Sequence, residues 1–411
     1  MQRIFFLSGL ALALTAACST VQAQKAEVTH WWTSGGESAA VRELATAYQK
    51  TGGIWEDAAV AGGTASRAIA VNRIVGGNPP TAALFNTSKQ YHELIAEGML
   101  NSIDGVAAKE GWDKLLPRPI LDSIRVNGHF YAVPVNIHNP GWFWYSKAAL
   151  QKAGITAEPR NIDEFFAALD KLKAAGLIPI AIGGQAWQEI VTFSALLINV
   201  AGKDTYLRFY QAHDPAVVDS EPFRRTLAAM RKLRGYVDAG SPGRNWNDGT
   251  ALLISGKAGY QIMGDWAKGE FASAKQQPGK DYGCFIGFTP TTPYQIGGDV
   301  FIFPKTVDAQ MVKAQQTLAS IMVAPSTQIA FNNKKGSIPI RTDVDLKQLD
   351  VCAQAGLTAM KDPARHLAVP EMLMAPDMFG NVQDAISKFW NSNTSVEAVI
   401  HTLRKALERN T

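Results

Sequence analysis

The sequence repeats a strand, a turn and a helix in that order, and this repeat limits the possible folds more than any other feature. The first copy is predicted as a strand at residues 27–32, a turn at 33–36 and a helix at 37–50. Further copies begin with apolar strands at 82–85 and 178–182. This alternation is typical of α/β proteins with mainly parallel sheets, whose ligand sites lie beyond the carboxyl ends of the strands.

The first residues have the pattern of a secretion signal. Arg3 precedes an apolar run over residues 4–17 that is too short to cross a bilayer. Small residues before position 24 predict cleavage after Ala23 and export of the mature chain. A lipoprotein acylated at Cys18 is the alternative, although Thr15 stands where an aliphatic residue is usual.

Charge and composition exclude several classes of partner. A formal net charge of +4 over 411 residues is too small to indicate nucleic acid or a strongly anionic partner. No later run of about 18 apolar residues predicts a membrane span, and a chain of this length normally forms about two domains. The histidines are scattered, so we assign no metal and no cofactor.

Two cysteines, Cys284 and Cys352, follow the expected cleavage point. An exported compartment permits a disulfide between them, which would stabilise the fold by roughly 3–4 kcal/mol. The sequence does not show whether they are close in space, so two free buried thiols are the alternative.

Seven short motifs follow one another along the chain after residue 23. They are WWTSGGE at 31–37, Gly128 with Tyr131 and Pro134, YSK at 145–147, AGI at 153–155, GKAGY at 256–260, GDW at 264–266 and KGSIPIR at 335–341. Each motif alone is weak, but in this order they resemble the extracellular solute-binding proteins of bacterial ABC sugar importers. The Trp-Trp start, with Trp246, Trp266 and His366 downstream, resembles the branch that binds glucose and related monosaccharides.

This resemblance implies a fold. It is α/β, a two-lobed periplasmic-binding-protein fold that is type II-like, with discontinuous lobes joined by a multi-strand hinge. The N-terminal lobe is expected to comprise residues 24–137 and 290–342, and the C-terminal lobe residues 138–289 and 343–411. The chain is expected to cross between the lobes near residues 135–139, 288–292 and 340–344.

The resemblance also implies a function, partners and a compartment, which is the periplasm. The expected ligand is a monosaccharide, glucose first, with galactose or mannose as alternatives, and the expected protein partners are inner-membrane ABC permease subunits. We expect a monomer that binds no nucleic acid and has no catalytic residues. The competing hypothesis is a secreted glycoside hydrolase acting on small saccharides, which needs two carboxyl groups about 5–10 Å apart. Its candidate carboxylates are Glu37, Asp265, Glu270 and Asp299.

Four indoles are candidates for stacking on the C–H face of a sugar. Trp31 and Trp32 point to opposite faces of their strand, so both can reach a ligand only where the strand ends. The glycine pair that follows them indicates such an end. Trp246 lies in a polar stretch, and Trp266 follows a predicted strand at 258–263. For each indole, packing in a lobe core is the alternative.

Charged side chains are candidates for contacts with sugar hydroxyls. Glu37 is one, although Ser34-x-x-Glu37 also fits a capping box at a helix start. Asp299 and Lys335 are two more, and their alternative is a mutual or local salt bridge. Lys89 is as well explained as a solvated lysine at a helix start.

Two histidines complete the set of candidates. His366 is expected to bind the ligand because of the resemblance, and its alternative is a core histidine. His138, near the first expected crossing, is considered as well.

Overall fold

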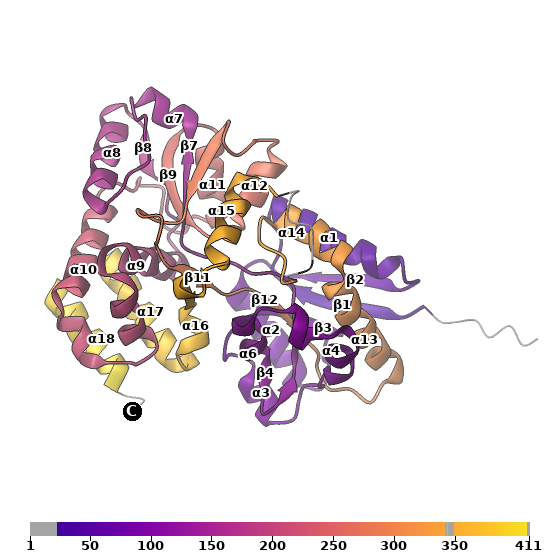
Figure 1. Ribbon diagram of the computed structural model, residues 1–411. Helices are drawn as coiled ribbons and strands as arrows, with labels where there is room; N and C mark the ends of the chain where they lie inside the picture. Colours follow the sequence, from indigo (N-terminus) through magenta and orange to yellow (C-terminus); the bar gives the residue numbers. More distant parts are fainter. Residues whose placement is uncertain (1–22, 342, 344–348, 409–411) are drawn as a thin grey trace, which may run out of the picture.

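The computed structural model describes residues 23–341, 343 and 349–408, and it shows an α/β protein with two lobes (Figure 1). The predicted signal segment and Cys18 lie outside the described residues. Within these ranges, no helix combines the length and the apolar character needed to cross a membrane.

The first lobe is built on a five-stranded sheet. In spatial order its strands are β2 (Ile54–Ala59), β1 (Lys25–His30), β3 (Ala82–Asn86), β12 (Asp299–Ile302) and β6 (Ala132–Pro134). The longer helices of this lobe are α1 (Gly35–Gln49), α2 (Gly63–Val75), α13 (Ala309–Val323) and α14 (Pro325–Lys335). The smaller elements are α3 (His92–Ala96), α4 (Asp104–Glu110), α5 (Trp112–Leu115), α6 (Arg118–Ile124) and the β4 (Arg125–Val126) and β5 (His129–Phe130) hairpin.

Strand order explains why this sheet is buried on both faces. The chain runs from β1 through α1 to β2, and then back through α2 to β3 on the other side of β1. Right-handed crossovers in opposite directions put α1 and α2 on opposite faces. A sheet covered on both faces needs unbroken apolar strands, and β3 and β12 are buried almost throughout.

The second lobe is built on a four-stranded sheet. In spatial order its strands are β10 (Tyr282–Phe285), β7 (Trp142–Ser146), β9 (Ala258–Met263) and β8 (Ile178–Ile180). Its helices are α7 (Lys147–Lys152), α8 (Ile162–Ala174), α9 (Ala186–Tyr210), α10 (Glu221–Arg234), α11 (Trp246–Ile254), α12 (Ala267–Ser273), α17 (Pro376–Asn391), α18 (Val396–Glu408) and the 3-10 helix η1 (Pro215–Asp219). Gly202, with a φ of 84°, interrupts the helical geometry of α9.

Three segments run between the lobes and pair with one another. The backbone N–H of Ile137 donates to the carbonyl of Ile338 at 2.8 Å, and that of His138 donates to the carbonyl of Gly297 at 3.0 Å. Next to them lie the parallel strands β11 (Tyr294–Ile296) and β13 (His366–Ala368), the helices α15 (Val351–Met360) and α16 (Pro370–Leu373) and the 3-10 helix η3 (Pro363–Arg365).

A disulfide joins Cys284 on β10 to Cys352 on α15. The sequence left the pairing of these two cysteines open. The bond attaches α15, which follows the third crossing, to the edge of the second sheet.

The expectation of mainly parallel sheets is wrong. β12 is antiparallel to both β3 and β6, and β7 is antiparallel to both β9 and β10. Each of these two strands enters its sheet directly from a crossing between the lobes, whereas the parallel strands arrive through a helical crossover. The local repeat of strand and helix does not predict the direction of a strand that follows a crossing from the other lobe.

Candidate binding site between the lobes

A histidine between two carboxylates lies at the junction of the lobes. Nδ1 of His138 is hydrogen-bonded to Asp265, which follows β9 in the second lobe, and its Nε2 lies 2.9 Å from Oδ2 of Asp299 at the start of β12 in the first lobe. All three residues are at most 5% exposed. Asp265 also accepts the backbone N–H of Asn139 at 3.1 Å. The three residues, here called the His138 cluster, therefore connect both lobes to the first crossing.

Electrostatics fix the charge of this cluster. Burial by itself lowers the pKa of His138, but the charges and hydrogen bonds of Asp265 and Asp299 raise that pKa to about 9. Burial raises the pKa of Asp299, but the charge and hydrogen bond of His138, the charge of Lys335 and the hydrogen bond of Asn136 together lower it below its ordinary value. At neutral pH the imidazole is therefore a cation, and Asp299 is an anion.

Two amide side chains hold the Asp299 carboxylate in one orientation. Asn136 donates to Oδ2 at 2.8 Å and accepts the backbone N–H of Asp299 at 2.7 Å. Asn86 donates to Oδ1 at 3.1 Å, and Arg67 in turn donates to the Asn86 oxygen at 2.9 Å. An ionised carboxylate has about four acceptor sites, of which His138, Asn136 and Asn86 occupy three. One acceptor site on Oδ1 is left for a further donor.

Half-buried indoles flank this cluster on both lobes. In the first lobe, the Arg67 guanidinium lies 5.2 Å from the centre of the Trp31 ring. In the second lobe, Trp266 contacts the His138 ring edge-on, with the ring centres 5.0 Å apart, and lies 6.2 Å from Trp187. A continuous series of contacts thus connects Trp31 with Trp266 through the polar side chains.

Trp32, the second indole of the pair, lies in the core of the first lobe. It is 1% exposed and packs against Phe301 and Phe331, with ring centres 5.6 and 5.3 Å away. β1 ends at His30, so the alternation of side chains along the strand does not continue through both indoles. The alternative of packing in a lobe core therefore describes Trp32, which was expected to contact the ligand, whereas Trp31 is half-buried beside Arg67.

Glu37 and Lys335 form a second buried polar group. Nζ of Lys335 donates to Glu37 at 2.8 Å and lies 5.4 Å from the Trp32 ring and 6.0 Å from the Trp266 ring. Ser34 caps α1 by accepting the backbone N–H of Glu37. The Glu37 carboxylate accepts the Ser34 hydroxyl and Lys335. The salt-bridge alternative thus describes Lys335, with Glu37 as its partner, and Asp299, with His138 as its partner.

The remaining candidates lie elsewhere. Lys89 donates to the carbonyl of Leu373 at 3.0 Å. Trp246 begins α11 and is half-buried against the core, and the ring of His366, on β13, is hydrogen-bonded to the carbonyl of Met360. In the part of the chain that the structure describes, none of these three side chains has a hydrogen bond or ring contact with the His138 cluster.

The sequence did not single out four residues of this interface: Arg67, Asn86, Asn136 and Trp187. A signal for Asn136 was present, because it and His138 are two apart in an extended segment and therefore share a face. Asn86 ends β3 beside β12, a pairing that the sequence does not reveal. Among the described residues, no group of three or more His, Cys, Asp and Glu side chains could hold a metal ion.

Among the described residues, the direct contacts between the lobes include hydrogen bonds at two separate places (Figure 1). At the first, the backbone N–H of Gly36 in α1 donates to Glu270 in α12 at 2.8 Å. The backbones approach so closely that a Cβ added at Gly36 would lie 2.5 Å from the carbonyl carbon of Gly269. The second place is the hydrogen bond from Lys89 to Leu373 in α16.

Comparisons with known proteins agree with this architecture. Residues 32–316 match the family model of bacterial extracellular solute-binding proteins. A relative in Brucella melitensis biotype 1, named "Probable sugar-binding periplasmic protein", is 40% identical over 97% of this chain and 98% of its own length.

Two solved structures share the fold of the chain. A chitin oligosaccharide binding protein covers 94% of this chain and 98% of its own, with a TM-score of 0.78 and 20% identity. The bacterial solute receptor AcbH, described as having an exclusive substrate preference for b-D-galactopyranose, covers 93% and 97%, with a TM-score of 0.78 and 21% identity. From the family match and the Brucella relative, the chain belongs to the bacterial extracellular solute-binding proteins.

Proposed function

We propose that the protein binds a sugar in the periplasm and delivers it to the inner-membrane permease of an ABC importer. The name of the Brucella relative supports the sugar and the compartment. A solute-binding protein is not an enzyme, so the hypothesis of a secreted glycoside hydrolase is set aside. We propose that the protein acts as a monomer.

The observation that carries the proposal is the fixed Asp299 carboxylate with indoles on either side. A sugar has apolar C–H faces that stack on indoles and hydroxyls that donate to carboxylates. Asp299 retains one acceptor site, and a hydrogen bond to a charged group contributes about 1.5–3 kcal/mol. Trp31 from the first lobe and Trp266 from the second offer the ring faces.

The other residues predicted to contact the ligand have different roles in this proposal. Lys335 uses one of its three N–H donors for Glu37, so it retains donors for a sugar hydroxyl. Trp32 supports the site from the core, beneath Lys335. The predicted ligand contacts of Lys89, Trp246 and His366 stay predictions.

The contacts between the lobes favour a small ligand. The hydrogen bonds of Gly36 with Glu270 and of Lys89 with Leu373 join the lobes at two separate places. A solute held between the lobes then has little room to extend past either contact. This supports a monosaccharide, glucose first and galactose or mannose next, although one related fold is that of a chitin oligosaccharide binding protein.

The proposed mechanism is closure of the lobes around the solute. The lobes comprise residues 24–137 with 290–342, and residues 138–289 with 343–411, and they move about the three paired crossings. A ligand shifts such an equilibrium only if it binds the closed form more tightly than the open form. A sugar that contacts both Asp299 and Trp266 meets this condition, because the two side chains come from different lobes.

A thermal-shift screen followed by calorimetry tests the proposal. The panel contains glucose, galactose, mannose, xylose, maltose and chitin oligosaccharides. A sugar present at one hundred times its dissociation constant stabilises the folded protein by about 2.7 kcal/mol, and we expect glucose to give the largest shift. A thermal shift with oligosaccharides alone would contradict the proposal of a monosaccharide ligand. If no sugar gave a thermal shift, the proposal of sugar binding itself would be contradicted.

A further inference from the structure

A small cavity lies where the three crossing segments meet the second lobe. Its volume is about 10 Å³, close to the roughly 10–15 Å³ that one water molecule requires. The walls come from β7, the loop after β9, α12, β11, the third crossing and α15. The lining residues are Trp142, Trp144, Asp265, Lys268, Tyr294, Gly336, Ile338, Cys352 and Ala353.

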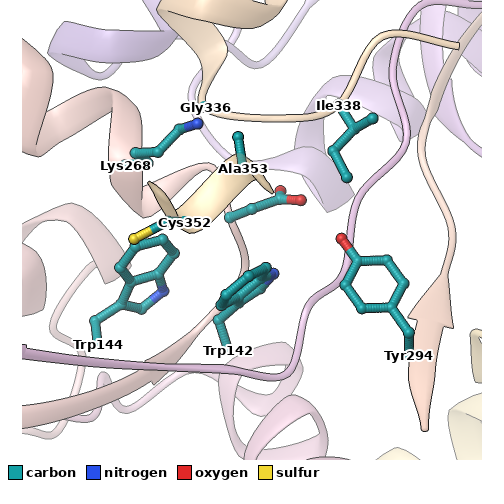
Figure 2. A pocket seen from close by; sticks show the side chains of 9 residues that line it. Trp142, Trp144, Lys268, Tyr294, Gly336, Ile338, Cys352 and Ala353 are labelled. Atoms are coloured by element: carbon teal, nitrogen blue, oxygen red, sulfur yellow. The ribbon is translucent and has the colours of Figure 1, made fainter. Parts of the chain in front are cut away.

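Two polar groups on the wall have no hydrogen-bond partner among the described residues. They are the indole Nε1–H of Trp142 and the hydroxyl of Tyr294, on side chains that are 2% and 0% exposed. Figure 2 shows the nitrogen of Trp142 and the hydroxyl of Tyr294 directed toward the same space. Leaving a buried donor unpaired costs about 1–3 kcal/mol, so both groups favour a partner inside the cavity.

The Asp265 carboxylate is the matching acceptor on the wall. Its hydrogen bonds to His138 and Asn139 use two of about four acceptor sites. Burial raises the pKa of Tyr294 well above its usual range, the charge of Asp265 raises it further, and Trp142 lowers it. Asp265 and Trp142 are therefore both near the Tyr294 hydroxyl, although neither the Trp142 indole N–H nor this hydroxyl has a hydrogen-bond partner among the described residues.

We infer that the cavity is a binding site for one structural water molecule. Trp142 donates to this water, Tyr294 shares a hydrogen bond with it, and the water donates to Asp265. Three partners are the usual number for a buried water. The carboxylate disfavours an anion, the two donors disfavour a cation, and the volume excludes a larger molecule.

The position of this water allows it to connect segments that run between the lobes. Tyr294 belongs to the segment that returns to the first lobe, Ile338 belongs to the third crossing, and Trp142 follows the first crossing directly. One water thus joins a hydrogen-bonding group that follows the first crossing to one on the segment that returns to the first lobe, and through Asp265 it contacts the His138 cluster.

A crystal structure of the full mature chain, at a resolution that shows ordered water elsewhere in the core, tests the inference. We expect electron density within hydrogen-bond distance of Trp142 Nε1, the Tyr294 hydroxyl and Asp265. Trp144→Phe is the matched control, because the indole of Trp144 lines the same cavity but donates to the carbonyl of Met263 at 2.8 Å. The density is expected to persist in Trp144→Phe and to disappear in the Trp142→Phe, Tyr294→Phe double variant.

Two outcomes would overturn the inference. One is a wild-type cavity without density, and the other is density that is unchanged in the double variant. If the double variant does not fold, Tyr294→Phe alone removes a single oxygen atom and tests the same point. In solution, we expect magnetisation exchange between water and the Trp142 indole N–H. The N–H signal is assigned by its loss in Trp142→Phe. If the wild type shows no such exchange, the inferred water is contradicted as well.

Discussion

At His138, a single imidazole ring is hydrogen-bonded to a carboxylate from each lobe. Removing one partner of a buried charge pair is costly, because it leaves the other charge uncompensated. The same ring is edge-on to Trp266. Charge and hydrogen bonds from both lobes therefore fix Asp299, the carboxylate proposed to bind the solute.

Asp299→Ala is expected to weaken glucose binding by tenfold or more, which is at least about 1.4 kcal/mol. The variant removes the acceptor site that Asn86, Asn136 and His138 hold in place. Calorimetry measures the dissociation constant, and circular dichroism checks that the variant folds. Asp122→Ala, at an exposed aspartate paired with Arg118, is the control and should bind like the wild type. An unchanged dissociation constant in folded Asp299→Ala would remove this carboxylate from the site.

The raised pKa of His138 predicts a pH dependence of stability. The carboxylates favour the imidazolium and raise the pKa to about 9 from an ordinary value near 6.5. The stabilisation is therefore complete below about pH 6.5 and is lost as the pH rises through about 9. Relative to His138→Gln, the free energy of unfolding of the wild type should fall by on the order of 3 kcal/mol between about pH 6 and pH 10.

Urea denaturation at a series of pH values measures this difference. Asp299, whose pKa is lowered, acts in the opposite direction, since its contribution is present at neutral pH and is lost on acidification. His401→Gln, at an exposed histidine of α18, is the control and should follow the wild type at every pH. A difference between wild type and His138→Gln that does not vary with pH would show that the ring is not held as a cation.

At the scale of elements, the contact between α1 and α12 depends on two glycines. A Cβ at Gly36 would lie within 3 Å of three backbone atoms of Gly269, and backbone cannot move aside as a flexible side chain can. At the neighbouring Gly35, the nearest atoms are side-chain atoms at 3.5 Å or more. The two positions therefore form a matched pair, one closed to a methyl group and one open to it.

Gly36→Ala is expected to keep the lobes apart and to weaken solute binding by tenfold or more, whereas Gly35→Ala should bind like the wild type. Small-angle X-ray scattering with and without glucose measures closure as a decrease in the radius of gyration. That decrease should be absent or reduced in Gly36→Ala alone. Equal closure in both variants would mean that α1 and α12 need not meet at this glycine.

The same scale shows what local patterns can and cannot predict. The strand at 82–85 and the helix after Ser34 are predicted well, because burial and capping act over a few residues. The antiparallel insertion of β7 and β12 cannot be predicted in this way, because it depends on crossings between distant parts of the chain. Asp299 can be predicted from its own short motif, whereas Asn86 and Arg67 cannot, because they reach it only through the pairing of β3 with β12.

At the scale of the whole molecule, the chain enters the first lobe twice. The second visit begins after β10 and includes β12, α13 and α14, and the third crossing then leads back to α15. The disulfide between Cys284 and Cys352 closes this excursion into a loop with a sequence separation of 68 residues. The bond thus restricts the unfolded chain and holds α15 on the second lobe.

The Cys284→Ser, Cys352→Ser double variant is expected to lose about 4 kcal/mol of stability. Closing a loop of this length lowers the conformational entropy of the unfolded chain, and this raises the free energy of the unfolded state by about that amount. Guanidinium denaturation followed by tryptophan fluorescence measures the loss. Wild-type protein under reducing conditions should approach the variant, and the same reductant should leave the variant unchanged. Because both cysteines lie outside the His138 cluster, the folded variant should retain its glucose affinity at low denaturant. A loss of affinity without a loss of stability would instead mean that the bond acts on the closed arrangement of the lobes rather than on the unfolded chain.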